Sequence, residues 1–383
     1  MTTDDDADEK WEKYPGHTRA KHNLLKYYLD IWIKMLGDKD RKIRIFDCFA
    51  GRGEYYPEDS VEPLEINNIQ TDAEIHGSPQ IILDLAVKYS GNVGDVECVF
   101  IEKKEKNASI LKDNLPDNDG LPETVSRKVV SGKFQDKTIE MVRRTGCFGP
   151  PTFFFIDPFG YSALEYDTVT EIASTDQFEV LINLMAEQVV RWQDADKQQE
   201  VIQIPFGQEN WREELEKYEP EQWDHKAVGY YCKRLEENGP DHTLAYLVTE
   251  ENTEKMKYYL VFGTNSDYGM DKMRDAMQNC GPGEFAFAPQ RSELSQDQAT
   301  LGEVTEEQKI SKIKSYLLDN FSNETKTFDK VVREISTRDE YWPYNRGQLR
   351  KAAKELEEDG KIDVMRVTSK TERGLGGDDL ITF

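Results

Sequence analysis

Three separate stretches of this chain place acidic and glycine residues where a nucleotide-like cofactor could bind. In the first, residues 43–46, which are apolar except for Arg44, lead to Asp47 and then to a loop. The positions of interest in that loop are Phe49, Ala50, Gly51 and Gly53. Because glycine has no Cβ, Gly51 and Gly53 allow a sharp turn and a close approach of the backbone to a ligand. Glycines after a strand can also make a turn without any ligand, and the stretch alone leaves both interpretations open.

The second and third stretches add acidic residues at the ends of two more mainly apolar runs. Glu102 follows residues 96–101, and a carboxylate in such a place can accept hydrogen bonds from both ribose hydroxyls of a cofactor. A surface strand can end in glutamate as well, so the ribose role is an interpretation. The third stretch, residues 152–156, is rich in phenylalanine and runs into the turn Asp157-Pro158-Phe159-Gly160.

The turn at residues 157–160 has the composition of a site for a flat substrate. Pro158 restricts the backbone, Phe159 can stack on a planar ring, and Asp157 with nearby carbonyl groups can hold an exocyclic amine. A structural turn capped by Asp157 explains the same residues. Asp157, Pro158, Phe159 and Gly160 are therefore candidate catalytic positions.

Alternating strand and helix patterns predict how these stretches are positioned. Strands are expected at residues 43–47, 96–101, 129–131, 152–156, 179–184, 243–249 and 257–263. Helices are expected at residues 18–35, 103–115, 135–144, 164–173 and 268–279, and one more begins with Ser78 as N-cap and Pro79 at its first position. The alternation predicts an α/β fold with a mainly parallel, Rossmann-like sheet and helices on both faces. Asp47, Glu102 and Asp157 would then meet at the carboxyl edge of the sheet.

Two polar segments interrupt the alternation. Residues 54–76 separate the glycine loop from the next helix, and they would hang over the cofactor loop as a lid or binding loop. Residues 186–240 form a charged helical insertion before the last strands. The start of the first helix is expected to be a solvated end rather than part of the site, although it carries His17, Arg19, Lys21 and His22.

The glycine loop favours S-adenosylmethionine over other cofactors. A dinucleotide-binding loop uses a third glycine and an immediate helix start to hold pyrophosphate. Here Tyr56 takes the third place, and the next helix signal comes only at residues 77–79. The GxxxxGK[ST] pattern of ATP-binding loops is absent from the sequence. A loop without a phosphate cradle, together with an acidic ribose partner, suits S-adenosylmethionine.

Taken together, these motifs resemble the three-Cys-motif partner (TcmP) family. The resemblance rests on Lys21-His22-x-x-Leu25-x-x-Tyr28, Asp47-x-Phe49-Ala50-Gly51-x-Gly53, Gly77-Ser78-Pro79, Phe155-Ile156-Asp157-Pro158-Phe159-Gly160 and the strand from Tyr258 to Gly263. It covers most of residues 14–280, and the C-terminal region also resembles that of the family. Membership would imply a class I methyltransferase-like fold and a partner protein with a three-cysteine, radical-SAM-like motif, which this chain lacks.

The same resemblance assigns roles by position. It makes Asp47, Phe49, Gly51 and Gly53 cofactor-loop residues. Residues 157–160 stand where amino-methyltransferases carry an Asp/Asn-Pro-Pro-aromatic motif, but here Phe159-Gly160 replaces the last two positions. A related form occurs in tRNA guanine-N2 methyltransferases, so the methylated atom stays open.

Composition limits the class of protein. The 383 residues include 49 Lys and Arg against 74 Asp and Glu, which gives a net charge of −25. This acidity opposes non-specific binding to nucleic acid, and it fits a protein that works in high salt. No apolar run approaches the roughly 18 residues of a membrane span, so neither a span nor a signal peptide is expected. Five cysteines in no metal-binding spacing suggest reduced thiols in a cytoplasm.

The C-terminal part has the pattern of a winged helix. Residues 1–12 are expected to form an acidic tail, 13–282 the methyltransferase-like domain, 283–302 a linker and 303–383 the winged-helix domain. Helices at 306–320, 327–337 and 345–359 precede strands at 361–367 and 379–383. Residues 301–383 hold 15 Lys and Arg against 17 Asp and Glu, a charge of −2, so phosphates would be repelled least there. Arg346, Arg350 and Lys354 form a stripe on the third helix that could contact nucleic acid or a partner protein.

The sequence therefore predicts an S-adenosylmethionine-dependent methyltransferase-like protein. Its substrate would be an exocyclic amine of a base in DNA or RNA, and it would act together with the three-cysteine partner. The alternative is a non-catalytic scaffold that keeps the fold to bind that partner. A scaffold needs no cofactor loop, so the joint presence of Asp47, Gly51, Gly53 and Glu102 favours the enzyme. An acidic nuclease site would need several carboxylates at metal-ligand spacing, and the sequence shows no such spacing.

Overall fold

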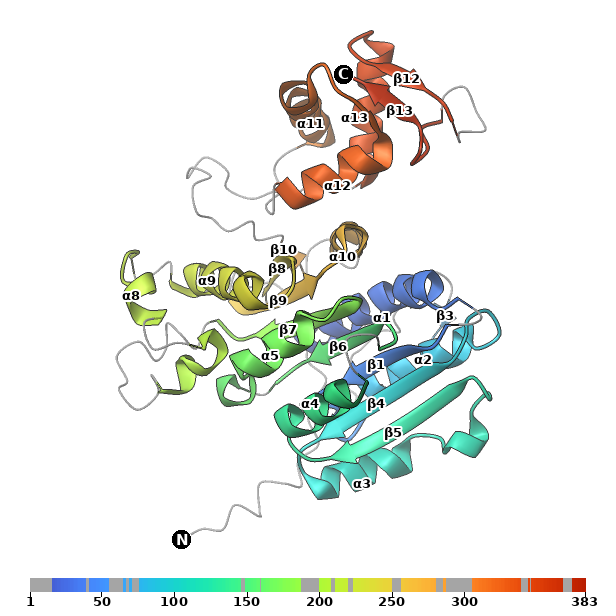
Figure 1. The fold of residues 1–383 in the computed structure, drawn as a ribbon, viewed down its shortest axis with the longest axis vertical. Helices are drawn as coiled ribbons and strands as arrows, with labels where there is room; N and C mark the ends of the chain where they lie inside the picture. The colour runs from blue at the N-terminus through green and yellow to red at the C-terminus, as the bar shows by residue number, and fades with distance from the viewer. Residues whose placement is uncertain are drawn as a thin grey trace.

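The computed structural model arranges the chain in two parts, one above the other in Figure 1. The larger part is built on one sheet flanked by helices, and the smaller C-terminal part combines three helices with a small sheet. The structure describes residues 16–38, 41–54, 65–66, 69–70, 76–145, 149–158, 160–186, 200–207, 211–219, 223–249, 256–279, 285–286, 305–338, 344, 346–367 and 374–383. The expected acidic tail, 1–12, lies outside these residues.

Eight strands form the large sheet in the order β10-β8-β9-β7-β6-β1-β4-β5. They are β1 (Ile43–Asp47), β4 (Val96–Glu102), β5 (Val125–Ser131), β6 (Thr152–Ile156), β7 (Phe178–Leu184), β8 (His242–Thr249), β9 (Met256–Thr264) and β10 (Phe285–Ala286). The central strands are parallel, whereas β9 is antiparallel to both of its neighbours, β7 and β8. An antiparallel strand between the fifth and sixth parallel ones is the arrangement of class I methyltransferases, and it differs from the parallel dinucleotide-binding order. The predicted fold class is confirmed.

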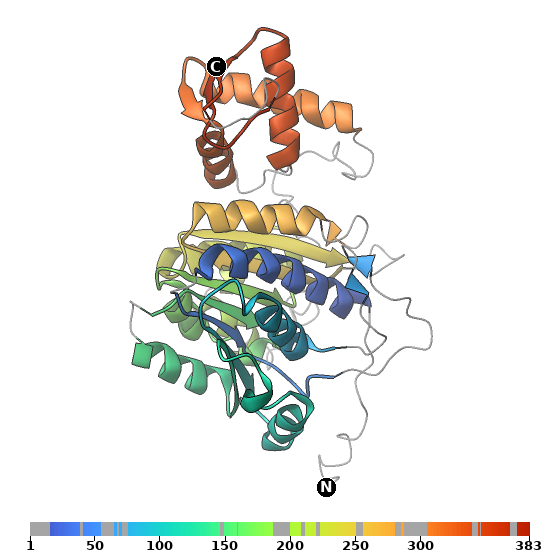
Figure 2. The same ribbon diagram turned by 90° about the vertical axis from the view of Figure 1, so that its right-hand side faces the viewer.

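Helices cover both faces of this sheet (Figure 2). On one face lie α1 (Gly16–Leu36), α2 (Ser78–Tyr89), α3 (Glu105–Asn114) and α10 (Asp267–Asn279). On the other lie α4 (Phe134–Thr145), α5 (Tyr166–Ala173), α8 (Trp211–Leu215) and α9 (Trp223–Asn238). Successive strand residues point to opposite faces, so Ile45 joins the first core and Phe46 the second. Within the described residues, no helix is both long and apolar enough to cross a membrane.

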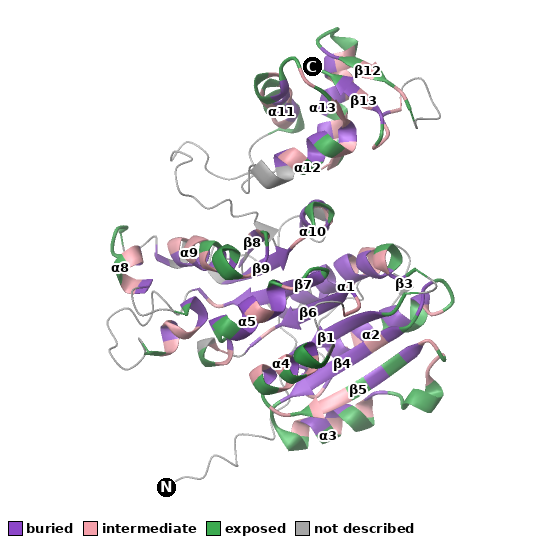
Figure 3. Cartoon of the chain, in the orientation of Figure 1, coloured by how far each residue is buried: buried purple, intermediate pink, exposed green. Residues whose placement is uncertain are grey.

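The central strands are buried along their length (Figure 3). All residues of β1 and of β6 are buried, because helices pack on both faces of the sheet. Strands buried on both faces carry apolar residues at nearly every position, and such runs are what the sequence shows at 43–46 and 152–156. β5 begins at Val125 and not at the predicted residue 129. It is an edge strand, and the charged residues in its first half interrupt the apolar pattern from which strands were predicted.

The C-terminal part is a winged helix. Its helices are α11 (Glu306–Phe321), α12 (Phe328–Arg338) and α13 (Arg346–Glu358), and its sheet has the order β11-β13-β12. The strands are β11 (Thr325–Thr327), β12 (Asp363–Met365) and β13 (Leu380–Thr382). The three residues of β11 were not predicted, because so short a strand has no apolar alternation to reveal it. A separate core, which includes Ile313, Leu349 and Ile381, holds this part together.

Two further details differ from the sequence prediction. Gly77, and not Ser78, is the N-cap of α2, and Ser78 is the first helical residue. β10 pairs with β8, so the large sheet extends into the segment 283–302 that was expected to be linker. Of the insertion 54–76, the structure describes its two ends and a small pair of strands, β2 (Glu65–Ile66) and β3 (Ile69–Gln70).

Candidate functional site

Three carboxylates meet at one edge of the large sheet. Asp47 is the last residue of β1, Glu102 is the last residue of β4, and Asp157 directly follows β6. β1 pairs in parallel with both β4 and β6, so all three residues leave adjacent strands at their carboxyl ends. The strand order reverses between β1 and β6, and the crevice at such a reversal holds the ligand in open α/β sheets. The structure thus brings the three predicted acidic residues together.

The loop after β1 has the backbone of a ligand cradle. Ala50 continues the ladder, since its N–H donates to the Ile101 carbonyl at 2.9 Å. Gly51 and Gly53 then adopt left-handed conformations with φ of 60° and 82°. A Cβ on Gly51 would have no described heavy atom within 4 Å, whereas a Cβ on Gly53 would lie 2.7 Å from the Leu111 side chain. Within the part of the chain that the structure describes, Gly51 therefore borders open space, whereas Gly53 is required by packing against α3.

The insertion 54–76 leaves this loop and returns to the same place. Glu54 and His76 form an antiparallel bridge, and the Gly77 N–H donates to the Gly53 carbonyl at 2.9 Å. α2 therefore begins against the glycine loop, as it would if the insertion were absent. The partial positive charge of a helix N-terminus is thereby placed at the carboxyl edge of the sheet.

Glu102 braces the glycine loop from the neighbouring strand. Its Oε2 accepts a hydrogen bond from the Gly51 N–H at 3.2 Å, and its Oε1 accepts one from the Lys104 N–H at 2.8 Å. The residue is buried, with 7% of its surface exposed. Each carboxylate oxygen has a further lone pair, so Glu102 can also accept a ribose hydroxyl. The ribose role stays a prediction beside this bracing role.

We expect Glu102→Ala to weaken the binding of S-adenosylmethionine by roughly ten- to hundredfold. A hydrogen bond to a charged group contributes about 1.5–3 kcal/mol, and here the loop would also lose its brace. Calorimetric titration of the purified variants measures the effect. Glu105→Ala, which removes an exposed carboxylate from nearby α3, is the matched control. Equal affinities in Glu102→Ala and the parent would show that Glu102 neither holds the ribose nor shapes the cradle.

Asp47 is fully buried below the loop. Its Oδ1 accepts the Phe49 N–H at 3.2 Å, while its Oδ2 is buried without a hydrogen-bond partner among the described residues. The pKa of the Asp47 carboxyl is raised to about 7, mainly by burial and also by the charges of Asp157 and Glu102, against the effect of the nearby Ser78 hydroxyl and the Phe49 N–H. A buried carboxylate oxygen beside two other carboxylates favours a cationic ligand.

Asp157 is held by two residues that the sequence did not single out for this role. Its Oδ2 accepts a hydrogen bond from the Lys21 Nζ at 2.5 Å, and its Oδ1 accepts one from the Asn183 Nδ2 at 2.6 Å. Lys21 comes from α1, and its Nζ also lies 5.2 Å from the centre of the Tyr258 ring. The polar Asn183 inside the apolar strand 178–184 was the available signal for one of them. These contacts leave Asp157 fixed in position, with its side chain 18% exposed.

The prediction of a solvated end for the first helix is wrong for its described polar side chains. Lys21 and His22 are buried, with 7% and 2% exposure. The pKa of His22 is lowered to about 3 by burial and by the charge of Lys21, against the opposing charge of Asp157. His22 is therefore neutral at physiological pH, next to a buried cation. The side chains of His17 and Arg19 lie outside the described ones. Helical spacing alone could not reveal that this turn packs into the sheet edge.

Of the remaining predicted site residues, two are packed or buried and one has room beside it. The Phe49 ring packs 5.3 Å from the ring of Phe134 on α4, which gives it a structural contact. Pro158 is buried. A Cβ on Gly160 would meet no described atom within 4 Å, so Gly160 has room beside it among the described residues. Phe159 lies outside the described residues, and its stacking role stays a prediction.

A cavity of about 400 Å³ lies at the opposite edge of the sheet. Phe178 and Glu179, at the start of β7, line it together with residues of α1 such as Trp32. Glu179 accepts hydrogen bonds from the Tyr28 hydroxyl at 2.7 Å and from the Thr264 hydroxyl at 2.9 Å, which ties α1 to β7 and β9. The cavity is therefore separate from the site formed by Asp47, Glu102 and Asp157. Among the described residues, no three His, Cys, Asp or Glu side chains are placed to hold a metal ion.

The three basic residues predicted on the third helix of the winged helix lie on α13. Arg346 is its first residue and is bonded to carboxylates within the chain. The Arg350 Nε donates to the Leu375 carbonyl at 3.0 Å, and Lys354 is half-buried. Two of the three are therefore engaged by the protein itself.

Several solved structures are similar to this chain. Protein LPL1258 from Legionella pneumophila, of the family DUF519, shares 15% identity at a TM-score of 0.42, with 71% of this chain and 95% of that chain covered. Trm1 from Pyrococcus horikoshii, solved with S-adenosyl-L-methionine, shares 11% identity at a TM-score of 0.34, with 94% and 90% covered. PKMT2 from Rickettsia typhi shares 12% identity at a TM-score of 0.30, with 88% and 70% covered.

Sequence comparisons identify one part of the chain. No curated protein matches the chain. Residues 284–369 match the family model described as GMT-like wHTH domain, in agreement with the winged helix of the structure.

Proposed function

We propose that this protein is an S-adenosylmethionine-dependent methyltransferase that acts on an exocyclic amine of a nucleic-acid base. The observation that carries the proposal is the arrangement of Asp47, Glu102 and Asp157 at the strand reversal, beside a glycine loop that borders open space at Gly51. The strand order of class I methyltransferases supports it.

The charge of the crevice supports this cofactor in particular. S-adenosylmethionine carries a sulfonium and an ammonium group against one carboxylate, so it is a cation. Asp47 offers it a buried carboxylate oxygen that has no described partner, and Asp157 and Glu102 add negative potential nearby. A dinucleotide carries phosphates, which the same three carboxylates would repel. Bound at the loop, S-adenosylmethionine would supply an electrophilic methyl group.

We expect the affinity for S-adenosylmethionine to rise with pH up to about 7 and then to level off. Below this pH the Asp47 carboxyl is protonated in the free protein, and a cation prefers the ionised form, so binding releases a proton. Measuring the dissociation constant across this range in parent and Asp47→Asn tests the idea. Protonation of S-adenosylmethionine itself changes the dissociation constants of both proteins equally, so it cancels in the comparison. A parent profile that matches the Asp47→Asn profile would contradict the assignment of Asp47.

The residues around Asp157 fit the handling of an amine. Its carboxylate can accept a hydrogen bond from an amine N–H through a lone pair that Lys21 and Asn183 leave free. Because these two side chains hold the carboxylate in place, the amine would be oriented without a further loss of side-chain freedom. Gly160 leaves room beside it for a flat base. We assign Asp157 the role of orienting the amine.

We further propose a protein partner with the three-cysteine motif, on the basis of the resemblance to the TcmP family.

The decisive experiment has two stages. Calorimetry with S-adenosylmethionine and with NAD, at low and high salt, tests the cofactor. Transfer of a labelled methyl group into bulk RNA and bulk DNA, with and without the partner, then tests the reaction. Tight NAD binding without affinity for S-adenosylmethionine would overturn the proposal, and cofactor binding without transfer under either condition would favour the scaffold.

A further inference from the structure

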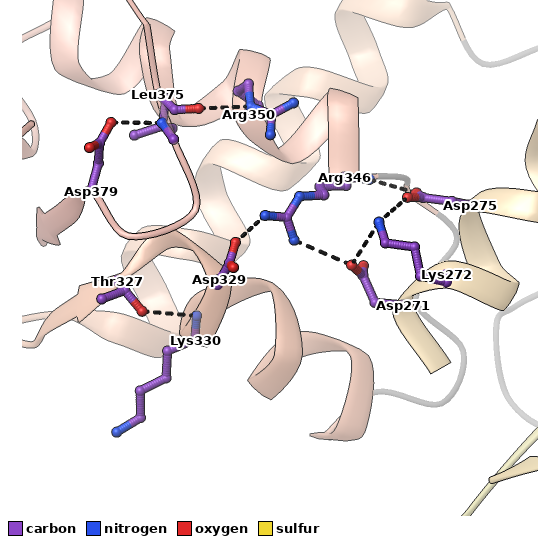
Figure 4. A network of polar contacts seen from close by, with 11 residues as sticks. Asp271, Lys272, Asp275, Thr327, Asp329, Lys330, Arg346, Arg350, Leu375 and Asp379 are labelled. Carbon is purple, nitrogen blue, oxygen red and sulfur yellow. Dashed lines mark hydrogen bonds and ion pairs between the residues drawn. The ribbon is translucent and has the colours of Figure 1, made fainter. Parts of the chain in front are cut away.

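The first turn of α13 is in contact with the large domain (Figure 4). Arg346 begins α13, and its Nη1 donates to Oδ2 of Asp271 on α10 at 3.3 Å. The Arg346 backbone N–H donates to Oδ1 of Asp275, also on α10, at 3.4 Å. The Nη2 of the same guanidinium donates to Asp329 at the start of α12. One arginine thus joins carboxylates of both parts of the chain.

This contact is partly shielded from water. The Asp271 side chain is 4% exposed and the Arg346 side chain is 16% exposed. α10 also packs against α12, and Lys272 lies beside the carboxylates, with its Nζ 3.3 Å from Asp275. The pKa of Arg346 is raised, because the carboxylates of Asp329 and Asp271 outweigh the opposing effect of burial. Ion pairs that are removed from water are screened less by salt than exposed ones, so this contact can hold the two parts together in solution.

The same turn is where a winged helix would meet nucleic acid. The helix that corresponds to α13 contacts base edges and phosphates with residues at its N-terminal end. A guanidinium recognises carboxylate and phosphate through the same forked geometry. In this structure, the first turn of α13 faces the Asp271 and Asp275 carboxylates of α10 instead.

We propose that α10 is an internal competitor for the first turn of α13, so that the winged helix binds a phosphate backbone only after it leaves α10. This inference rests on the proposed action on nucleic acid. The unbound protein would be closed by the Arg346 contacts. Nucleic acid would have to replace Asp271 and Asp275, and its affinity would be reduced by the fraction of molecules in the closed state.

The test uses the full chain and a pair of variants with equal net charge. Asp271→Asn with Asp275→Asn removes the charges of α10 that face Arg346. The control, Asp113→Asn with Asp119→Asn, removes two exposed carboxylates next to β4 and β5, far from α10 along the sheet. Small-angle scattering reports opening through the radius of gyration. Anisotropy of labelled short DNA and RNA duplexes reports affinity at low salt.

The first variant is expected to have a larger radius of gyration and about tenfold tighter duplex binding, which corresponds to a closed state favoured about tenfold in the parent. The control is expected to match the parent in both measurements. Arg346→Gln is expected to open the chain without the gain in affinity, because it also removes a phosphate contact. This third variant guards against misfolding of the aspartate variant.

Three results would overturn the inference. An unchanged radius of gyration in both the aspartate variant and Arg346→Gln would show that these contacts do not hold the parts together. Opening without tighter duplex binding, or no duplex binding by any variant, would show that α10 does not compete with nucleic acid. The calorimetric test of the cofactor is independent of both results, so failure here is distinguishable from failure of the proposed enzyme.

Discussion

Gly51→Val should reduce the affinity for S-adenosylmethionine by at least about a hundredfold while the protein stays folded. Gly51 has a φ of 60° and no described heavy atom within 4 Å of a Cβ position. A valine side chain would enter the space proposed for the cofactor, and a steric clash with a ligand cannot be relieved by the rigid sheet edge. Calorimetric titration of the variant measures the loss.

Backbone strain has to be separated from this clash. A side chain in a left-handed conformation costs roughly 1–2 kcal/mol wherever it occurs. Gly360, just after α13, is a matched control because its φ is 63° and its Cβ position is equally open. Gly360→Val should therefore lose similar stability in thermal unfolding but bind the cofactor as the parent does. If Gly51→Val binds as tightly as Gly360→Val, the loop is not the cofactor cradle.

Asp157→Ala should lower the rate of methyl transfer by roughly 10²-fold, the cost typical of a misplaced reacting group. The substitution removes the carboxylate proposed to orient the amine, and it leaves the glycine loop intact. Labelled methyl incorporation into bulk RNA and DNA measures the rate. Cofactor affinity should change much less than the rate, since Asp157 follows β6 and not β1.

Lys21→Met distinguishes a site role of Asp157 from a role in stability. Lys21 donates to Asp157 at 2.5 Å, and its loss would leave the carboxylate with Asn183 as its other described donor. Stability should fall, because a partly buried carboxylate loses its cation. Lys21→Met with Asp157→Asn should regain part of that stability without regaining activity. An active double variant would contradict the catalytic assignment of Asp157.

The sequence by itself determined the architecture of the large domain and the three acidic residues that meet at the carboxyl edge of its sheet. Strands buried on both faces are apolar at nearly every position, so the mainly apolar runs that lead to Asp47, Glu102 and Asp157 could be recognised, and parallel strands bring such ends to one edge. Glycine at 51 and 53 predicted a sharp turn, and both residues adopt left-handed conformations in the structure. The winged helix followed from helical periodicity and two apolar strands.

Tertiary structure alone decided which partners these residues have. Lys21 and Asp157 are 136 positions apart, and helical spacing in α1 gives no indication of the strand end that it reaches. The bracing of Gly51 by Glu102 depends on the register between β1 and β4, which local sequence does not encode. Arg346 has the spacing of a solvent-facing stripe, yet it turns toward Asp271 because α10 and α12 pack together. Charge and periodicity are local properties of the chain, whereas pairing, burial and the resulting pKa shifts arise only when distant elements meet.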